Sequence, residues 1–231
     1  MTARLLLVRH GITAWNREGR FQGHLDPPLA DDGRKEAGLL AERLADGVDR
    51  PDRIVTSPLQ RAATTADLIA GGLGDDAPNV EHDPRLMEIG QGEWEGRTHA
   101  ELAVEDAERY AAWRQHSDQA QPPGAETIEA VLARVAELLH ELAAAPGDVT
   151  CVVSHGGIIR LAARHLLGLG AIRSWAMDVD NASLSVLTAT APAPATGSGS
   201  AWRVERWNDT AHLLGRAPLH VDESEGEPLA L

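Results

Sequence analysis

The chain has 231 residues, 43% of them hydrophobic, with a formal net charge of −14 at pH 7 and no block of lysine or arginine. This size and apolar content suit one α/β domain, and the acidic charge argues against nucleic acid or an anionic membrane as a partner. Because no apolar stretch is long enough for a bilayer span or a signal peptide, and Cys151 is the only cysteine, we expect a cytoplasmic protein in a reducing compartment.

Two kinds of pattern predict the secondary structure. Short continuous apolar runs predict buried strands, and longer segments with apolar residues on one face predict helices. Ser57-Pro58 predicts a helix start, with an N-cap followed by proline at the first helical position. In chain order, the predicted elements are strand Arg4–Val8, helix Ala30–Leu44, strand Ile54–Thr56, a helix from Ser57 through Ile69, strand Val80–His82, helix Ala100–Gln115, helix Glu126–Ala144, strand Val149–Ser154, helix Gly156–Leu167, and the paired strands Ala182–Leu187 and Trp202–Trp207.

The segments between these elements are of several kinds. The composition of residues 11–29 predicts a loop. The segment Leu86–Arg97 has no helical or strand-like hydrophobic period and predicts irregular structure. Thr190–Ser200 has low complexity and predicts a mobile loop. We expect one domain over residues 1–215, followed by a disordered acidic tail over residues 216–231.

The alternation of strands and helices predicts an α/β fold, a three-layer α/β/α sandwich with a mostly parallel central sheet. Ligands of such sheets bind at the carboxyl ends of the strands. Three predicted strand ends carry cations or imidazoles, namely Arg9-His10-Gly11, Arg61 shortly after Thr56, and His155-Gly156. We therefore expect a preformed pocket for a dianion in an otherwise acidic protein.

Six sequence blocks, in the expected order, resemble the signature of the histidine phosphatase superfamily, also called phosphoglycerate mutase-like. Thr127 stands where that family usually has serine after Gly-x-Glu. The resemblance covers roughly residues 4–209. The blocks are Arg9–Asn16, Phe21–Asp26, Ser57–Ala62, Leu86–Gly96, Pro123–Thr127 and Ser154–Arg160.

The resemblance implies a role for each residue of the predicted site. His10 would be the nucleophile that forms a phosphohistidine, while Arg9, Arg61 and His155 would bind the transferring group. Glu88 would act as general acid and then as base, with Glu93 and Glu95 as the next candidates and Glu81 also nearby. The positions that match the lining of the phosphate pocket are Thr13, Asn16, Gln22, Gly23 and Gly156.

The chemistry of these residue types supports that assignment. A neutral imidazole is a competent nucleophile near pH 7, and flanking cations disfavour its protonated form. Each arginine can present a planar fork to phosphate oxygens. Metal-ligand spacings such as HExxH and CxxC are not found, so we expect no metal and no other cofactor.

The predicted function is a metal-independent phosphatase for a small phosphorylated metabolite, such as a sugar phosphate or a phosphoglycerate derivative. A cofactor-dependent phosphoglycerate mutase is the alternative, although Glu88 and His155 lie too close in sequence to hold the longer insertion that covers the site in such mutases. A catalytically dead module that binds a phosphorylated ligand is a further alternative. Two segments, Trp202–Asn208 and Gly92–Ala100, resemble actinobacterial members of the family, which include the glucosyl-3-phosphoglycerate phosphatases. The α-ribazole phosphatases are a further possible group. The sequence does not decide between a monomer and a homodimer.

Overall fold

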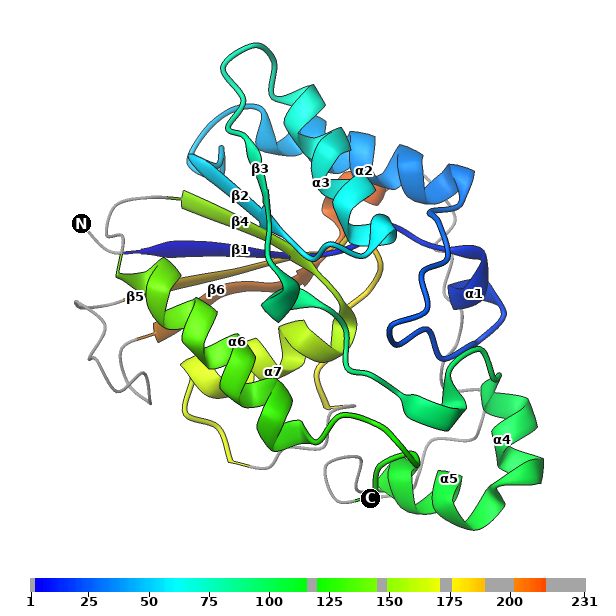
Figure 1. The fold of residues 1–231 in the computed structure, drawn as a ribbon. Coiled ribbons are helices and arrows are strands. Elements are labelled where there is room, and N and C mark those ends of the chain that lie inside the picture. The colour runs from blue at the N-terminus through cyan, green and yellow to red at the C-terminus, as the bar shows by residue number, and fades with distance from the viewer. Residues whose placement is uncertain (1–2, 116–119, 145–148, 171–175, 190–201, 215–231) are drawn as a thin grey trace.

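The computed structural model describes residues 3–115, 120–144, 149–170, 176–189 and 202–214. In these residues a six-stranded sheet with the order β3-β2-β4-β1-β5-β6 forms the centre of the molecule (Figure 1). The first four strands in that order run parallel, and β5 and β6 add to the sheet as an antiparallel pair. The strands are β1 (Arg4–Arg9), β2 (Arg53–Thr56), β3 (Val80–His82), β4 (Val149–Ser154), β5 (Leu184–Ala189) and β6 (Trp202–Asp209).

Helices cover both faces of the sheet (Figure 1). One face carries α2 (Asp31–Leu44) and α3 (Gln60–Gly72), and the other carries α6 (Ile128–Ala143) and α7 (Gly156–Leu166). Successive residues of β1 point to opposite faces, so that Leu6 packs in the core under α2 and α3 while Leu7 packs in the core under α6 and α7. The predicted three-layer α/β/α sandwich is confirmed.

A smaller unit lies beyond the carboxyl edge of the sheet and holds an aromatic cluster of its own. The cluster consists of Phe21, Trp94, Leu102, Tyr110 and Trp113, all buried. Its short elements are α1 (Ala14–Arg17), the 3₁₀ turn η2 (Gly92–Trp94), α4 (His99–Glu105) and α5 (Ala107–Gln115). The 3₁₀ turn η1 (Pro84–Leu86) packs against α6, with Leu86 in the core under that helix, and η4 (Ala211–Leu213) follows β6.

The single helix predicted over Ala100–Gln115 is wrong. Asp106 leaves the helical conformation, with φ −134° and ψ 42°, and separates α4 from α5. Its carboxylate accepts a hydrogen bond of 3.0 Å from the indole N–H of Trp94. The break therefore lets α5 fold back onto the aromatic cluster. The local hydrophobic period does not predict this break, because it depends on the contact with Trp94.

The predicted cap at Ser57-Pro58 is also wrong, because α3 begins only at Gln60 and continues to Gly72. Leu59 is the N-cap residue and makes no side-chain capping bond. The carboxylate of Asp26, from a distant loop, instead accepts the backbone N–H of Gln60 at 2.8 Å. The hydroxyl of Ser57 is used at the functional site described below.

Other element boundaries differ by small shifts. Thr127 caps α6, so this helix starts two residues after the predicted Glu126. Ala182 has a positive φ of 54° and lies in a turn, so β5 starts at Leu184 rather than at Ala182. Residues 190–200 and 216–231 lie outside the described residues, and the mobile loop and the disordered tail stay predictions.

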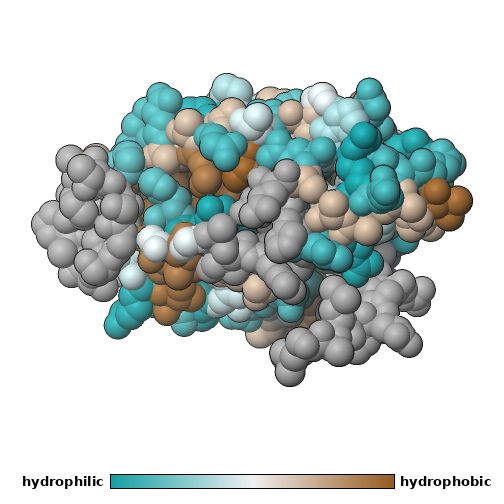
Figure 2. Space-filling view, turned by 90° about the horizontal axis from the view of Figure 1, so that it is seen from below, coloured by the Kyte–Doolittle hydropathy of each residue, from teal (hydrophilic) through white to brown (hydrophobic). Residues whose placement is uncertain are grey.

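The described surface is mainly hydrophilic on the face that Figure 2 shows, with small separate apolar areas. Within the described residues, no helix has the length and apolar character that crossing a membrane requires. The large apolar side chains that are exposed belong to separate segments, at Leu25, Val48, Val104, Leu169, Val204 and Leu214.

Candidate active site

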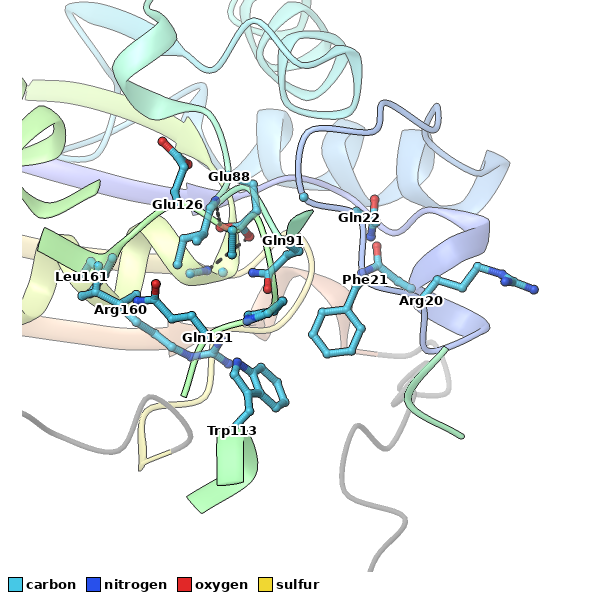
Figure 3. Close-up of a pocket in the computed structure, with 18 of the residues that line it drawn as sticks. Arg20, Phe21, Gln22, Glu88, Gln91, Trp113, Gln121, Glu126, Arg160 and Leu161 are labelled. Atoms are coloured by element: carbon cyan, nitrogen blue, oxygen red, sulfur yellow. Dashed lines mark hydrogen bonds between the residues drawn. The ribbon is translucent and has the colours of Figure 1, made fainter. Parts of the chain in front are cut away.

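A pocket opens at the carboxyl ends of β1, β2 and β4 (Figure 3). The hydrogen-bond ladder continues past the strand ends, since the His10 N–H donates to the Ser154 carbonyl at 3.0 Å and the Ser57 N–H to the Val153 carbonyl at 3.0 Å. The predicted side chains therefore emerge side by side. Of the predicted site residues, those lining the pocket are Arg9, His10, Asn16, Gln22, Gly23, Arg61, Glu88 and Gly156.

The ring of His10 is oriented and kept neutral. Its Nδ1 lies 2.7 Å from the Gly11 carbonyl, which can only accept, so Nδ1 carries the ring hydrogen and Nε2 keeps its lone pair. Burial, and then the charges of Arg61 and Arg9, hold the pKa of His10 well below its usual value. This is the state in which an imidazole can attack phosphorus at neutral pH.

His155 is fully buried directly behind His10, with 5.2 Å between the two ring centroids. Its Nε2 lies 2.9 Å from the hydroxyl of Ser57, and its Nδ1 has no hydrogen-bond partner among the described residues. Burial and the charge of Arg61 are the first causes that hold the pKa of His155 well below its usual value. When Ser57 donates to Nε2, the neutral ring carries its hydrogen on Nδ1, which can then be donated to an anion.

Arg61 supplies a buried cation that the backbone holds in place. Its guanidinium donates to the carbonyls of Leu25 and Gly23, both at 2.9 Å, and Asp26 lies 3.7 Å away, beyond hydrogen-bond distance. Burial lowers the pKa of Arg61 to about 10, so the group is still charged at neutral pH. Gly23 has a φ of +50°, and a Cβ there would lie 2.2 Å from a carboxylate oxygen of Glu95, so this loop requires glycine.

Arg9 lies beside the first residue of α7. It donates to the Val179 carbonyl at 2.6 Å, and its Nε would lie 3.6 Å from a Cβ at Gly156. The N-terminus of a helix favours anions through its N–H groups and its dipole. Arg9 and the start of α7 thus add to the positive potential that Arg61 provides.

A polar network arranges the amide side chains of Asn16 and Gln22. The Thr13 hydroxyl carries one hydrogen, which has two acceptors within reach, the side-chain oxygens of Asn16 at 3.0 Å and Gln22 at 3.3 Å. The Thr13 N–H at 3.0 Å and the Asn181 amide at 3.3 Å also donate to the Asn16 oxygen. With their oxygens turned toward Thr13, both amides keep N–H donors for an anion in the pocket. Thr13 itself is completely buried and does not line the pocket, so the structure places it behind Asn16.

Glu88 is the only one of the four candidate acids that lines the pocket in the described residues. Its carboxylate accepts the N–H of Ile89 at 2.9 Å and that of Gly157 at 3.3 Å (Figure 3). A Cβ at residue 157 would lie 2.5 Å from this carboxylate, so glycine there allows the acid to approach α7. Glu95 instead accepts the backbone N–H of Gln91 from its own loop and that of His24 from a distant segment, and Glu81 pairs with Arg53.

A second carboxylate, Glu126, lines the pocket and was not predicted from the sequence. It accepts hydrogen bonds from Arg134 at 2.9 Å and from the Gly90 N–H at 2.8 Å. Burial acts to raise the pKa of Glu126, but these hydrogen bonds outweigh it and hold the pKa below its usual value. Glu126 therefore stays ionised and is a poor candidate for a proton donor.

The outer end of the pocket is built by the smaller unit and by α7. The residues there were also not predicted as site residues, and they mix cationic and apolar side chains. They include Arg20, Phe21, His99, Trp113, Arg160 and Leu161 (Figure 3). Among the described residues, no group of three or more His, Cys, Asp or Glu is arranged to hold a metal ion.

The lowered pKa of His10 predicts a pH dependence of stability. The unfolded chain binds a proton at this histidine below about pH 6.5 and the folded chain does not, so folding stability is lost as the pH falls below that value. Between pH 6.5 and 5, the free energy of unfolding of a His10→Asn variant should therefore fall by about 1.4 kcal/mol less per pH unit than that of the wild-type protein. Urea unfolding of both proteins across this range measures the difference, and parallel curves would show that His10 titrates normally.

Comparisons with known proteins agree with the geometry. A family model described as "Histidine phosphatase superfamily (branch 1)" matches residues 5–210. A glucosyl-3-phosphoglycerate phosphatase of Mycolicibacterium vanbaalenii is 35% identical, with 91% of this chain and 96% of that protein covered. A metal-independent phosphoserine phosphatase of Arabidopsis thaliana is 31% identical, with 90% of this chain and 82% of that protein covered. The structure of a mycobacterial glucosyl-3-phosphoglycerate phosphatase with inorganic phosphate is 33% identical with a TM-score of 0.76, covering 91% of this chain and 99% of that one.

Proposed function

This chain belongs to the histidine phosphatase superfamily, and we propose that it hydrolyses phosphate monoesters in two steps through a phosphohistidine at His10. It is a phosphatase of small phosphorylated metabolites, the activity for which the two relatives described above are named. The observation that carries the proposed nucleophile is the hydrogen bond of 2.7 Å from Nδ1 to the Gly11 carbonyl, which leaves Nε2 of a neutral ring for the attack.

In the first step, Nε2 of His10 attacks phosphorus in line with the leaving group, and the bond from phosphorus to the ester oxygen breaks. Charge on the equatorial oxygens is stabilised by Arg9, Arg61 and the Nδ1–H of His155. Glu88 gives its proton to the departing alkoxide.

In the second step, water attacks the phosphohistidine and the bond from phosphorus to Nε2 breaks. Glu88, now a carboxylate, takes the proton of the attacking water, and inorganic phosphate leaves. The same group thus acts as acid and then as base. The amide N–H donors of Asn16 and Gln22 hold the phosphoryl oxygens in both steps.

This chemistry needs no metal, and that expectation has a direct test. Turnover of p-nitrophenyl phosphate should be unchanged by a chelator, because Arg9 and Arg61 supply the positive charge and the neutral ring of His155 adds an N–H donor. Loss of activity with the chelator, followed by recovery with a divalent ion, would contradict it. The same assay separates an enzyme from a binding module, which would show no turnover.

The remaining alternative is a mutase, which must keep the phosphohistidine away from water until the phosphate returns to substrate. Supplied with 3-phosphoglycerate and 2,3-bisphosphoglycerate, the protein should release inorganic phosphate faster than it forms 2-phosphoglycerate. Coupled assays on one sample measure both products. Isomerisation much faster than phosphate release would establish the mutase.

We propose a sugar phosphate or a phosphoglycerate derivative as the substrate class, on the likeness to the glucosyl-3-phosphoglycerate phosphatases. The mixed cationic and apolar outer end of the pocket suits a polar leaving group that carries its own charge. We also propose a cytoplasmic site of action, which the single cysteine, Cys151, supports because disulfides are rare in that compartment. The acidic net charge favours small metabolites over nucleic acid as partners.

A further inference from the structure

We propose that Arg134 of α6 is a positioning residue for Glu88, because it fixes the main chain from which this acid extends. The inference rests on the proposed function of Glu88 as the general acid and goes beyond it. Arg134 does not line the pocket, so in this proposal it acts only through the loop.

Glu88 needs such support because it lies in an irregular segment. Residues 88–91 connect η1 to η2 and belong to no helix or strand. A general acid must stay within hydrogen-bond distance of the leaving oxygen, and a misplacement of about 1 Å can cost about 100-fold in rate. The position of the carboxyl therefore depends on contacts that the loop makes with other parts of the molecule.

Arg134 makes these contacts along the loop. One guanidinium nitrogen donates to the carbonyls of Arg85 at 2.6 Å and Met87 at 2.8 Å. The other donates to the carbonyl of Glu88 itself at 3.2 Å and to the carboxylate of Glu126 at 2.9 Å. One side chain thus holds three main-chain carbonyls within four residues at the acid, with charge-assisted hydrogen bonds.

Two further groups complete what we call the clamp, which consists of Arg134, Glu126 and His24. Glu126 accepts the N–H of Gly90 at 2.8 Å and so fixes the loop on the other side of the acid. His24 donates from Nε2 to the Glu88 carbonyl at 2.8 Å, and this nitrogen lies 3.4 Å from Glu126. Figure 3 shows Glu126 next to Glu88 at the same side of the pocket.

A neighbouring arginine provides a matched control. Arg85 also ties this loop to α6, through surface ion pairs with Glu137 at 3.1 Å and Glu141 at 2.8 Å. In the described residues, the Arg85 side chain hydrogen-bonds to the carboxylates of Glu137 and Glu141 and not to the main chain of residues 87–90. Exposed pairs of this sort contribute about 0–1 kcal/mol, so Arg85→Gln should loosen the attachment to α6 without moving the acid.

The test compares kcat/KM for p-nitrophenyl phosphate, whose leaving group needs little protonation, with kcat/KM for glycerol 3-phosphate, whose alkoxide needs a proton. Arg134→Gln should lower kcat/KM for glycerol 3-phosphate about tenfold or more, and kcat/KM for p-nitrophenyl phosphate by less than about threefold. Arg134→Lys, which keeps the charge but not the fork, should fall between wild type and Arg134→Gln. Arg85→Gln should leave the ratio of the two values as in wild type.

A double variant supplies a readout that a purely structural role would not move. In a Glu88→Gln background, Arg134→Gln should cause no further loss with glycerol 3-phosphate, because its effect passes through Glu88. Equal losses with both substrates, or losses that multiply in the double variant, would overturn the proposal. If Arg134→Gln does not fold, Glu126→Gln gives the same comparison through the other half of the clamp.

The outcome for Glu88→Gln alone distinguishes failure of the acid assignment of Glu88 from failure of the positioning role of Arg134. Selective loss with glycerol 3-phosphate in Glu88→Gln, without selective loss in the Arg134 variants, refutes positioning and leaves the acid assignment standing. Equal loss with both substrates in Glu88→Gln refutes the acid assignment itself, and the positioning proposal with it.

Discussion

His10→Asn should lower kcat for p-nitrophenyl phosphate by about 10⁴-fold or more, since it removes the nucleophile on which both chemical steps depend. Asparagine offers an N–H near the position of Nδ1, so the hydrogen bond to the Gly11 carbonyl can be kept. The structural change is therefore small compared with the chemical one. Steady-state assays with purified protein measure the loss.

The control for this variant is phosphate binding. Arg9, Arg61 and His155 remain in place, so inorganic phosphate should still bind within about tenfold of its wild-type affinity, as calorimetry can measure. Unaltered binding with lost turnover assigns His10 to the chemistry. Turnover above about 1% of wild type in a folded variant would mean that another group attacks phosphorus.

Glu88→Gln should have the second largest effect, and the effect should depend on the leaving group. Without a proton donor, kcat/KM for an alkyl monoester such as glycerol 3-phosphate should fall by about 10²–10⁴-fold, and that for p-nitrophenyl phosphate by less than about tenfold. Because glutamine also cannot activate water, kcat should fall for both substrates. The first turnover with p-nitrophenyl phosphate should then appear as a burst of nitrophenolate.

Other carboxylates offer little means of replacing Glu88. Glu126 is ionised and bound to Arg134, and Glu95 is bound to the backbone N–H groups of His24 and Gln91. Equal losses of kcat/KM for both substrates would nevertheless move the acid role to another group.

Much of the fold could be predicted because it depends on local patterns. The buried run at residues 5–8 and the apolar stripe of the helix at residues 30–44 have the periods of the structures they form. The boundaries that failed depend on distant contacts. Asp106 interrupts the helical segment and accepts a hydrogen bond from Trp94, and Asp26 caps α3 from another loop. Neither interaction has a signal in the neighbouring sequence.

The predicted site shows the same division. His10 and His155 follow apolar strands directly, so parallel pairing of β1 and β4 brings them together without further information. Glu126 and Arg134 could not be recognised as parts of the site, because their contacts reach across about 40 residues of sequence to the loop of Glu88. Glu126 lies in the Pro123–Thr127 block that carries the family resemblance, but that block predicts no role for it in the site, and Arg134 lies outside every block.

The most direct test of the account is to trap the covalent intermediate. Glu88→Gln, mixed with p-nitrophenyl phosphate carrying a labelled phosphoryl group and quenched within the burst, should hold close to one label per chain. The label should be stable to base and labile to acid, and peptide mapping should place it on His10. A burst without bound label, an acid-stable label, or a label on another residue would contradict hydrolysis through a phosphohistidine at this position.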